Sequence, residues 1–446
     1  MRAGGSSRER KGSVQKRQKG YLGTAVAARV GANSSVDARV RRYYAFQILV
    51  AFQIWSPFWT IWLFNHFTYF VGTIVDVIFW IVSLLVAMPA GAFADRYGRK
   101  RAVVLGVAIW MTGIISFGLS DSFVTFALSN AIWAFGAGFL WGAGSAYLYD
   151  TLVEVHAEAR YPAVTSRAAL YSYLGTALAS LVGGVIILTT ARLDLTLVLY
   201  GVPGLGALVL GLTFQEPSVP RKPESSMFGQ IAAGLRTARG NRQIVLVIFF
   251  QVLVGFVSYM MALFRGVFLN QTLSGDLVVV AIIYCGFYVV AAISGGLTGR
   301  FMNRFGEWGG LVLVFVMVFA PFPVIYLIAQ RAFSSDFAGI LAVLTQLPDY
   351  VVWGIEAVLI TTIINRRVGS DGRATVLAIE MFCSTLVIAI VEPVAGLVAT
   401  DYSLGTGLAM GALVASIPTA YILAAYRRNE RVLARPAAPG APTRGR

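Results

Sequence analysis

The chain has 446 residues, of which 57% are hydrophobic and 13% are charged, and its mean hydropathy is +0.72. Soluble domains carry about 25% charged residues, so a set of soluble domains is excluded and most of this chain must lie in lipid. The 36 Lys and Arg residues against 21 Asp and Glu give a formal net charge of +15. In a membrane protein, such an excess indicates basic loops on the cytoplasmic face rather than a nucleic-acid-binding surface.

Residues 1–42 are polar and basic, and they carry 11 of the Lys and Arg residues. Such a segment buries too little apolar surface to fold, so we expect a disordered cytoplasmic tail. It lacks the apolar core and the small-residue cleavage site of a signal peptide. Attraction to anionic lipid accounts for its charge better than a nucleic-acid-binding arm does, and we expect no nucleic acid among the partners.

Twelve mostly apolar runs follow the tail, each close to the roughly 20 residues that a membrane-spanning helix needs. They are 43–64, 70–94, 102–119, 123–150, 164–188, 195–214, 244–270, 277–299, 310–329, 337–364, 375–399 and 404–426. Strands of a membrane barrel would alternate polar and apolar residues, and these runs do not. The sequence therefore predicts an all-α membrane protein with 12 transmembrane helices.

The basic residues predict the orientation of these spans. Of the 36, 33 lie in the two tails or at the loops that follow even-numbered spans. By the positive-inside rule, both termini and every even-numbered loop are cytoplasmic, in a multi-pass protein of the plasma or inner membrane.

The longest internal loop divides the spans six and six. Within it, Phe228, Ile231 and Leu235 recur at helical spacing beside three arginines, which predicts an amphipathic helix on the membrane surface. The predicted domains are a tail (1–42), an N-terminal half (43–214), a linker (215–243), a C-terminal half (244–426) and a second tail (427–446).

The two halves also share a sequence motif. The loop after span 2 reads GAFADRYGRK from Gly91 to Lys100, and the loop after span 8 reads GRFMNRFG from Gly299 to Gly306, at an offset of 208 residues. The residues that carry the motif are Gly91, Asp95, Arg96, Gly98, Arg99 and Lys100, repeated in part by Gly299, Asn303, Arg304 and Gly306. A repeat of this kind is hard to explain by orientation alone.

This motif, its position after span 2 and the division into two six-helix halves resemble the major facilitator superfamily over residues 43–426. The resemblance implies alternating access around a site between the halves, with the motif as a gate that is made in one conformation and broken in the other. It also implies that Asp150, at the end of span 4, belongs to the gate. Two signatures of proton-driven drug antiporters are missing: span 4 reads IWAFG from Ile132 to Gly136, and the glycines of span 5 lack the usual proline.

Ionisable groups at membrane depth are functional candidates, because lipid does not solvate charge. Asp349 and Glu356 lie two turns apart on one face of span 10 and are the leading candidates for coupling or substrate binding. Arg265 of span 7 would bind an anionic substrate, pair with an acidic side chain or extend to the outer surface. Further candidates lie nearer span ends (Glu380, Glu392 and Asp76) or are polar groups for a cavity wall (Gln53, Tyr147, Gln251 and Tyr259).

Trp55, Trp59 and Trp62 share one face of span 1. They could form an aromatic wall for a substrate, but an interfacial belt or helix packing explains them more simply.

The function that fits these features is secondary active transport of a small molecule by alternating access. No phosphate-binding loop is present, so we expect a proton gradient to supply the energy, with export favoured over uptake. The alternatives are an uptake symporter or facilitator of the same fold, a sensor or scaffold that transports nothing, and a membrane-embedded enzyme. The two histidines lie in loops on opposite sides, and Cys285 and Cys383 have no metal-binding spacing, so we expect no enzyme activity, metal or cofactor. The expected partners are the substrate, protons and lipid, and the expected oligomeric state is a monomer.

Overall fold

The computed structural model describes residues 36–219, 241–367 and 370–433. In these residues the chain is helical without strands. The predicted linker helix at 228–235, the far N-terminal tail and most of the second tail lie outside the described residues.

The N-terminal half consists of a helix over residues 36–50 followed by α2 to α8. Their bounds are α2 (Trp59–His66), α3 (Tyr69–Tyr97), α4 (Arg99–Gly118), α5 (Phe123–Glu154), η1 (Glu158–Arg160), α6 (Tyr161–Thr190), α7 (Leu193–Val198) and α8 (Gly201–Leu212). Helix starts carry side-chain caps where backbone amides need acceptors: Thr68 caps α3, and Ser122 forms a capping box on α5.

The C-terminal half consists of α10 to α15. Their bounds are α10 (Arg242–Thr272), α11 (Leu277–Phe319), α12 (Phe322–Ala329), α13 (Ser335–Arg367), α14 (Ser370–Asp401) and α15 (Leu404–Leu433). The long α11 contains two helices that meet at Gly306, whose φ of 66° is available to glycine.

Eleven helices of the described chain are long and apolar enough to cross a membrane. The predicted first span differs from the other eleven. Its helix begins by residue 36 rather than at 43, stops after residue 50 and resumes only at Trp59. Pro57 removes a backbone donor in this interval. Two hydroxyl groups satisfy the carbonyls that the break frees: Tyr200 donates to the oxygen of Val50 at 3.0 Å, and Thr176 donates to that of Ala51 at 2.7 Å.

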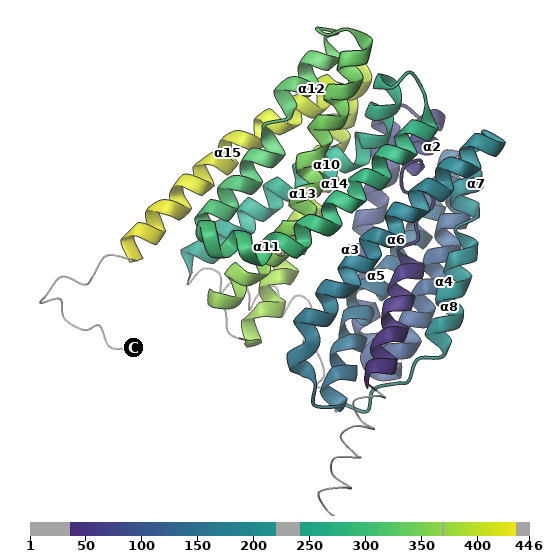
Figure 1. Ribbon diagram of the computed structural model, residues 1–446, viewed down its shortest axis with the longest axis vertical. Helices are drawn as coiled ribbons and strands as arrows, with labels where there is room; N and C mark the ends of the chain where they lie inside the picture. Colours follow the sequence, from purple (N-terminus) through teal and green to yellow (C-terminus); the bar gives the residue numbers. More distant parts are fainter. Residues whose placement is uncertain (1–35, 220–240, 368–369, 434–446) are drawn as a thin grey trace, which may run out of the picture.

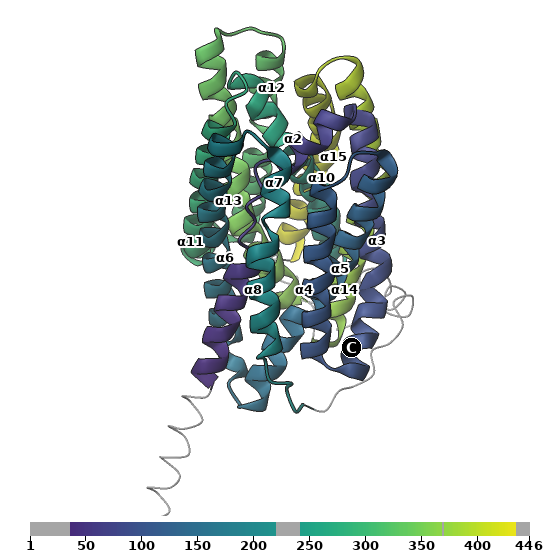
Figure 2. The same ribbon diagram turned by 90° about the vertical axis from the view of Figure 1, so that its right-hand side faces the viewer.

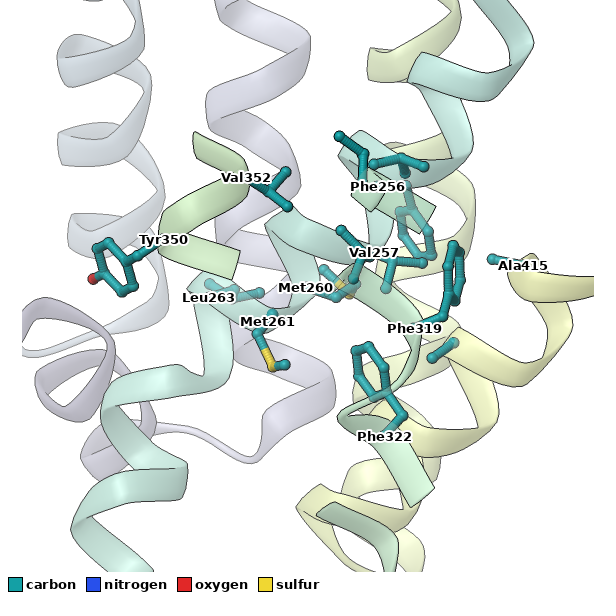
Figure 3. Close-up of a cluster of buried hydrophobic side chains, with 14 of the residues drawn as sticks. Phe256, Val257, Met260, Met261, Leu263, Phe319, Phe322, Tyr350, Val352 and Ala415 are labelled. Carbon is teal, nitrogen blue, oxygen red and sulfur yellow. The ribbon is translucent and has the colours of Figure 1, made fainter. Parts of the chain in front are cut away.

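The two halves lie side by side, and both ends of the described chain lie at one end of the bundle (Figure 1). We call this the basic end, since Arg96, Arg99 and Lys100 lie there between α3 and α4. Each half has its own buried core: one cluster contains only residues of 36–214, and the other contains mainly residues of 244–426. Figure 3 shows the second core, where Phe256 and Met260 of α10 meet Phe319 and Phe322.

The halves contact each other mainly along two helix pairs, α6 with α11 and α3 with α14 (Figure 2), and α2 also contacts α10. Small residues allow the close approach. A Cβ on Gly396 of α14 would lie 2.5 Å from the Thr73 hydroxyl of α3, and a Cβ on Gly184 of α6 would lie 2.9 Å from that of Ala281. In Figure 1 the halves approach each other toward the end opposite the basic end and diverge toward the basic end.

Candidate functional site

A cavity of about 340 Å³ lies between the two halves and is lined mainly by aromatic side chains. Seven of the nine tryptophans contribute to its wall. They are Trp55, Trp59, Trp80, Trp110, Trp133, Trp141 and Trp353, joined by Phe79, Tyr259, Tyr284 and Tyr288. The few polar groups include Gln53, Ser56 and Asn130. The wall draws on both halves, so a molecule held there would contact both.

The break in the first span explains how residues 51–58 reach the cavity. Trp55 packs edge-on against Trp133 of α5, with ring centroids 4.8 Å apart. Ser56 forms a 2.6 Å hydrogen bond with the hydroxyl of Tyr288 on α11 and so joins the two halves. The predicted lining position of Gln53 agrees with the structure. Trp59 lines the cavity and also packs against Trp133 of α5, with ring centroids 5.8 Å apart, so it combines the predicted aromatic wall with the predicted helix packing. Trp62 donates to the Phe117 carbonyl at 3.2 Å.

Arg265 and Asp349 form a buried ion pair at the cavity wall. They are 1% and 2% exposed. Arg265 also donates to Gln346 at 3.1 Å, and its guanidinium carbon lies 4.4 Å from the centroid of the Tyr350 ring. Extension of Arg265 to the outer surface is therefore wrong. Asp349 has a cationic partner on α10, and the pair is neutral and lies within the C-terminal half.

A second buried cluster joins the two halves. Asp76 of α3 is 3% exposed and accepts a hydrogen bond from the Tyr259 hydroxyl of α10. Its carboxyl group also lies within hydrogen-bonding reach of that of Glu392 on α14, which is fully buried. Gly396 lies one turn from Glu392 on α14, and Thr73 lies one turn from Asp76 on α3. The close contact of Gly396 with Thr73 brings the two helices together at this level.

The two carboxyl groups have no cationic partner among the described residues. No donor among those residues reaches either oxygen of Glu392. Two buried carboxylates close to each other are costly to ionise together. Their positions near span ends ranked Asp76 and Glu392 below Asp349 and Glu356 as candidates, and the structure places both at the buried interface between the halves.

The other predicted cavity residues are more dispersed. Glu356 is half-buried beside Gln251, and Glu380 accepts a 3.0 Å hydrogen bond from Ser384. Tyr147 is not in the cavity wall. It stacks on Phe214, with centroids 4.6 Å apart and ring planes at 7°, because α5 carries it past the cavity toward the basic end.

The predicted gate residues form a connected network at the basic end. Arg99 pairs with Asp95 at 2.9 Å and with Asp150 at 3.2 Å, so the predicted place of Asp150 agrees with the structure. A residue that the sequence did not single out completes the network: the Glu216 carboxylate accepts from the backbone amides of Arg99 at 2.7 Å and of Lys100 at 2.8 Å. Glu216 thus caps the start of α4, where the helix dipole favours an anion.

Gly98 is required at this turn for two reasons. Its φ is 114°, which side-chain-bearing residues rarely adopt. A Cβ at this position would also lie 2.7 Å from the carboxyl carbon of Glu216. These contacts join α3, α4 and α5 to Glu216, which follows α8.

The second copy of the motif shows a related arrangement. After the turn at Gly306, Glu307 pairs with Arg366 at 3.0 Å and with Arg367 at 2.5 Å. The guanidinium carbon of Arg304 lies 5.8 Å from the Phe305 ring centroid. Contacts of Gly299 and of the Asn303 side chain lie outside what the structure describes. The two copies of the motif therefore share backbone geometry as well as sequence, since each has a glycine with positive φ, Gly98 and Gly306.

A larger hollow, of about 520 Å³, lies between α11, α12 and α15. Its wall is apolar, and Val316, Met410 and Leu413 in it are about half exposed or more on the outer surface of the bundle. Such a surface faces lipid. The tryptophan-lined cavity, which both halves line and which carries ionisable groups, is the better candidate for the site.

Comparisons with known proteins agree with this architecture. A 72-residue stretch is 36% identical to the uncharacterized MFS-type transporter YfiU of Bacillus subtilis (strain 168), covering 16% of this chain and 14% of that protein. A 70-residue stretch is 34% identical to multidrug resistance protein 2 of the same organism, covering 16% and 18%. The chain thus matches less than a fifth of the length of these curated relatives.

Two solved structures show the same fold. The nucleoside transporter NupG aligns with a TM-score of 0.68 at 13% identity, over 88% of this chain and 99% of NupG. A bacterial homologue of the human lysosomal transporter Spinster, in an inward-facing and occupied conformation, aligns with a TM-score of 0.65 at 17% identity, over 92% and 99%. The family model of the Major Facilitator Superfamily matches residues 44–392. The chain is therefore a member of the Major Facilitator Superfamily, a multi-pass membrane protein whose fold supports transport by alternating access.

Proposed function

We propose that this protein is a secondary active transporter that exports a small molecule through the tryptophan-lined cavity, driven by protons that bind at Asp76 and Glu392. The observation that carries the proposal is the contact of these two carboxyl groups across the halves, beside a cavity that both halves line. We keep the predicted orientation, with both termini and the basic end cytoplasmic. The structure then corresponds to the inward-facing state.

The proton step follows from the chemistry of the carboxyl pair. With one shared proton, Asp76 and Glu392 attract each other and stabilise the contact of α3 with α14. Loss of that proton leaves two buried anions that repel each other. The repulsion separates the halves at the end opposite the basic end, so the outward-facing state becomes the deprotonated one.

Export is favoured by the wall of the cavity. Its aromatic surface suits an amphipathic compound, and one of the curated relatives is named as a multidrug resistance protein. An uptake symporter would use the same carboxyl pair but would load the substrate from the other side of the membrane. Export and uptake are distinguished by the direction of the substrate gradient that drives protons across the membrane.

The proposal is testable without knowledge of the substrate. With Cys285 and Cys383 replaced by serine, spin labels at Asp121 and Ser334 report the separation of the halves at the end opposite the basic end, and labels at Glu158 and Arg428 report it at the basic end. All four positions are exposed. Raising the pH should lengthen the first distance and shorten the second, as measured by double electron–electron resonance.

Variants identify the groups responsible. Asp76→Asn combined with Glu392→Gln should abolish the response to pH, because neither side chain then ionises. Glu380→Gln, which replaces a carboxylate on the same helix as Glu392, should leave the response intact. If the label distances in the protein with the native Asp76 and Glu392 do not change with pH, proton coupling at this site is refuted.

A further inference from the structure

The charges in the cavity wall do not cancel. Arg265 is neutralised by Asp349 within hydrogen-bonding contact. Asp76 accepts from the Tyr259 hydroxyl, and among the described residues no cation pairs with it or with Glu392. The described residues of the wall include no second cation. The surroundings of the cavity thus contain carboxyl groups at the Asp76 side that no described cation neutralises, in a region where an uncompensated charge is costly.

The aromatic rings supply the complementary surface. Trp133 meets Trp55, Trp59 and Trp110 edge to face, with ring planes at 85°, 77° and 88°. Rings arranged in this way turn faces as well as edges toward the space between them, and the face of an indole attracts a cation placed within about 6 Å. Trp80 stands at 87° to Tyr259, the residue that donates to Asp76. The Asp76 carboxyl group is therefore bordered by aromatic rings.

Two polar groups of the wall are engaged with the protein itself: Asn130 donates to the carbonyl of Val75 at 2.7 Å, and Ser56 bonds to Tyr288. The indole N–H groups of Trp55 and Trp133 have no partner among the described residues, so a ligand can carry a hydrogen-bond acceptor beside its aromatic rings. The volume of about 340 Å³ is within the usual range for a drug-sized ligand.

We propose that the tryptophan-lined cavity binds a monovalent organic cation with aromatic bulk, whose charge lies near Asp76 and whose rings pack against Trp133 and Trp141. This inference rests on the proposed transport function, for which it names the substrate class. Charge selection comes from the carboxyl pair, and size selection comes from the indole rings.

The test is equilibrium binding of two probes of nearly equal size and opposite charge to the purified full-length protein in detergent. Tetraphenylphosphonium is the cation and tetraphenylborate is the anion, and binding to protein-free micelles is subtracted. The cation should bind at least about tenfold more tightly than the anion. The cation gains a charge-assisted contact with the carboxyl group, whereas the anion is repelled by it.

Two variants probe the two parts of the site. Asp76→Asn should weaken binding of the cation about tenfold or more. Trp141→Leu changes a side chain that is 47% exposed, so its folding is secure, and it should weaken binding about threefold or more. Trp308→Leu is the matched control, since Trp308 is outside the cavity wall and packs against Arg427 instead; it should bind as the unmodified protein does.

Equal or tighter binding of the anion, or unchanged binding by both cavity variants, would overturn the inference. The spin-label experiment separates this result from failure of the proposed function. A protein that responds to pH but does not select the cation remains a transporter of another substrate class. A protein that selects the cation but never changes conformation binds this class without the proposed transport.

Discussion

The buried ion pair of Arg265 and Asp349 allows a quantitative test of how this membrane interior tolerates charge. The perturbation is Arg265→Met, which keeps much of the side-chain volume and removes the cation. Because the two residues are 1% and 2% exposed, the variant leaves an anion in a site that water does not reach. Breaking a buried pair in this way typically costs about 3–5 kcal/mol.

The loss of stability in Arg265→Met has an upper bound, because Asp349 can take up a proton instead of remaining a buried anion. Protonating an ordinary aspartate, with a pKa of about 3.9, costs about 1.4 kcal/mol per pH unit, or about 4 kcal/mol at about pH 7. At about pH 5 the same step costs only about 1.5 kcal/mol. Loss of the contact between Arg265 and the Tyr350 ring, 4.4 Å away, adds about 1 kcal/mol at either pH. We therefore expect a penalty of about 5 kcal/mol near neutral pH that halves in mild acid.

The assay is the free energy of unfolding in mixed micelles, titrated with sodium dodecyl sulfate at both pH values. Arg265→Met with Asp349→Leu removes both charges and should lie within about 1 kcal/mol of the unmodified protein or be more stable. Arg192→Met is the control. It breaks the pair with Asp194, in which the Arg192 side chain is 62% exposed, and should cost less than about 1 kcal/mol. A loss of unfolding free energy for Arg265→Met that is small at neutral pH, or that is the same at both pH values, would refute this reasoning.

Three further predictions concern the basic end and the orientation. Asp95→Asn should weaken the contact with Arg99 and reduce the pH-driven shortening between labels at Glu158 and Arg428, with normal expression; an unchanged distance change would remove Asp95 from the gate. Gly98→Ala should destabilise the protein by about 1–3 kcal/mol from its backbone conformation alone, seen as a lower midpoint of thermal unfolding, and a midpoint at or above that of the unmodified protein would contradict the strain argument. A membrane-impermeant maleimide should label a single cysteine at Glu158 only in inside-out vesicles, and labelling from the cell exterior would reverse the proposed orientation.

The helices, the two halves and the gate motif could be predicted because their signals are local. An apolar run of about 20 residues needs only its own composition to be identified as a span. The motif around Asp95 and Gly98 needs only the tight turn that a glycine permits. The structure adds that Glu216, which follows the last span of the half, completes this turn. An acidic residue directly before Pro217 was a weak signal that could have indicated a cap.

The break in the first span and the carboxyl pair depend on contacts between distant parts of the chain. The break is tolerated because Thr176 and Tyr200, more than 120 residues away, bond to the freed carbonyls. Asp76 and Glu392 meet because of the close approach at Gly396, and no local pattern predicts which helix faces which. Counting residues from the end of an apolar run estimates depth in the membrane, but it does not tell whether a carboxyl group faces lipid, solvent or another half.

The distribution of ion pairs over the halves supports the Asp76–Glu392 pair as the site of the proposed proton binding. In the described part of the chain, each salt bridge joins residues of the same half, including Arg265 with Asp349 and Arg99 with Asp150. A pair buried inside one half, such as Arg265 with Asp349, moves with that half, so its contact does not have to break when the halves rock. The contacts that cross between the halves are otherwise neutral, such as Ser56 with Tyr288. Among the described residues, the Asp76–Glu392 pair lies between the halves, and on the proposed function it would change its charge with a proton and break when the halves rock. A proton bound there would then have a different free energy in the two states. That difference is what coupling requires.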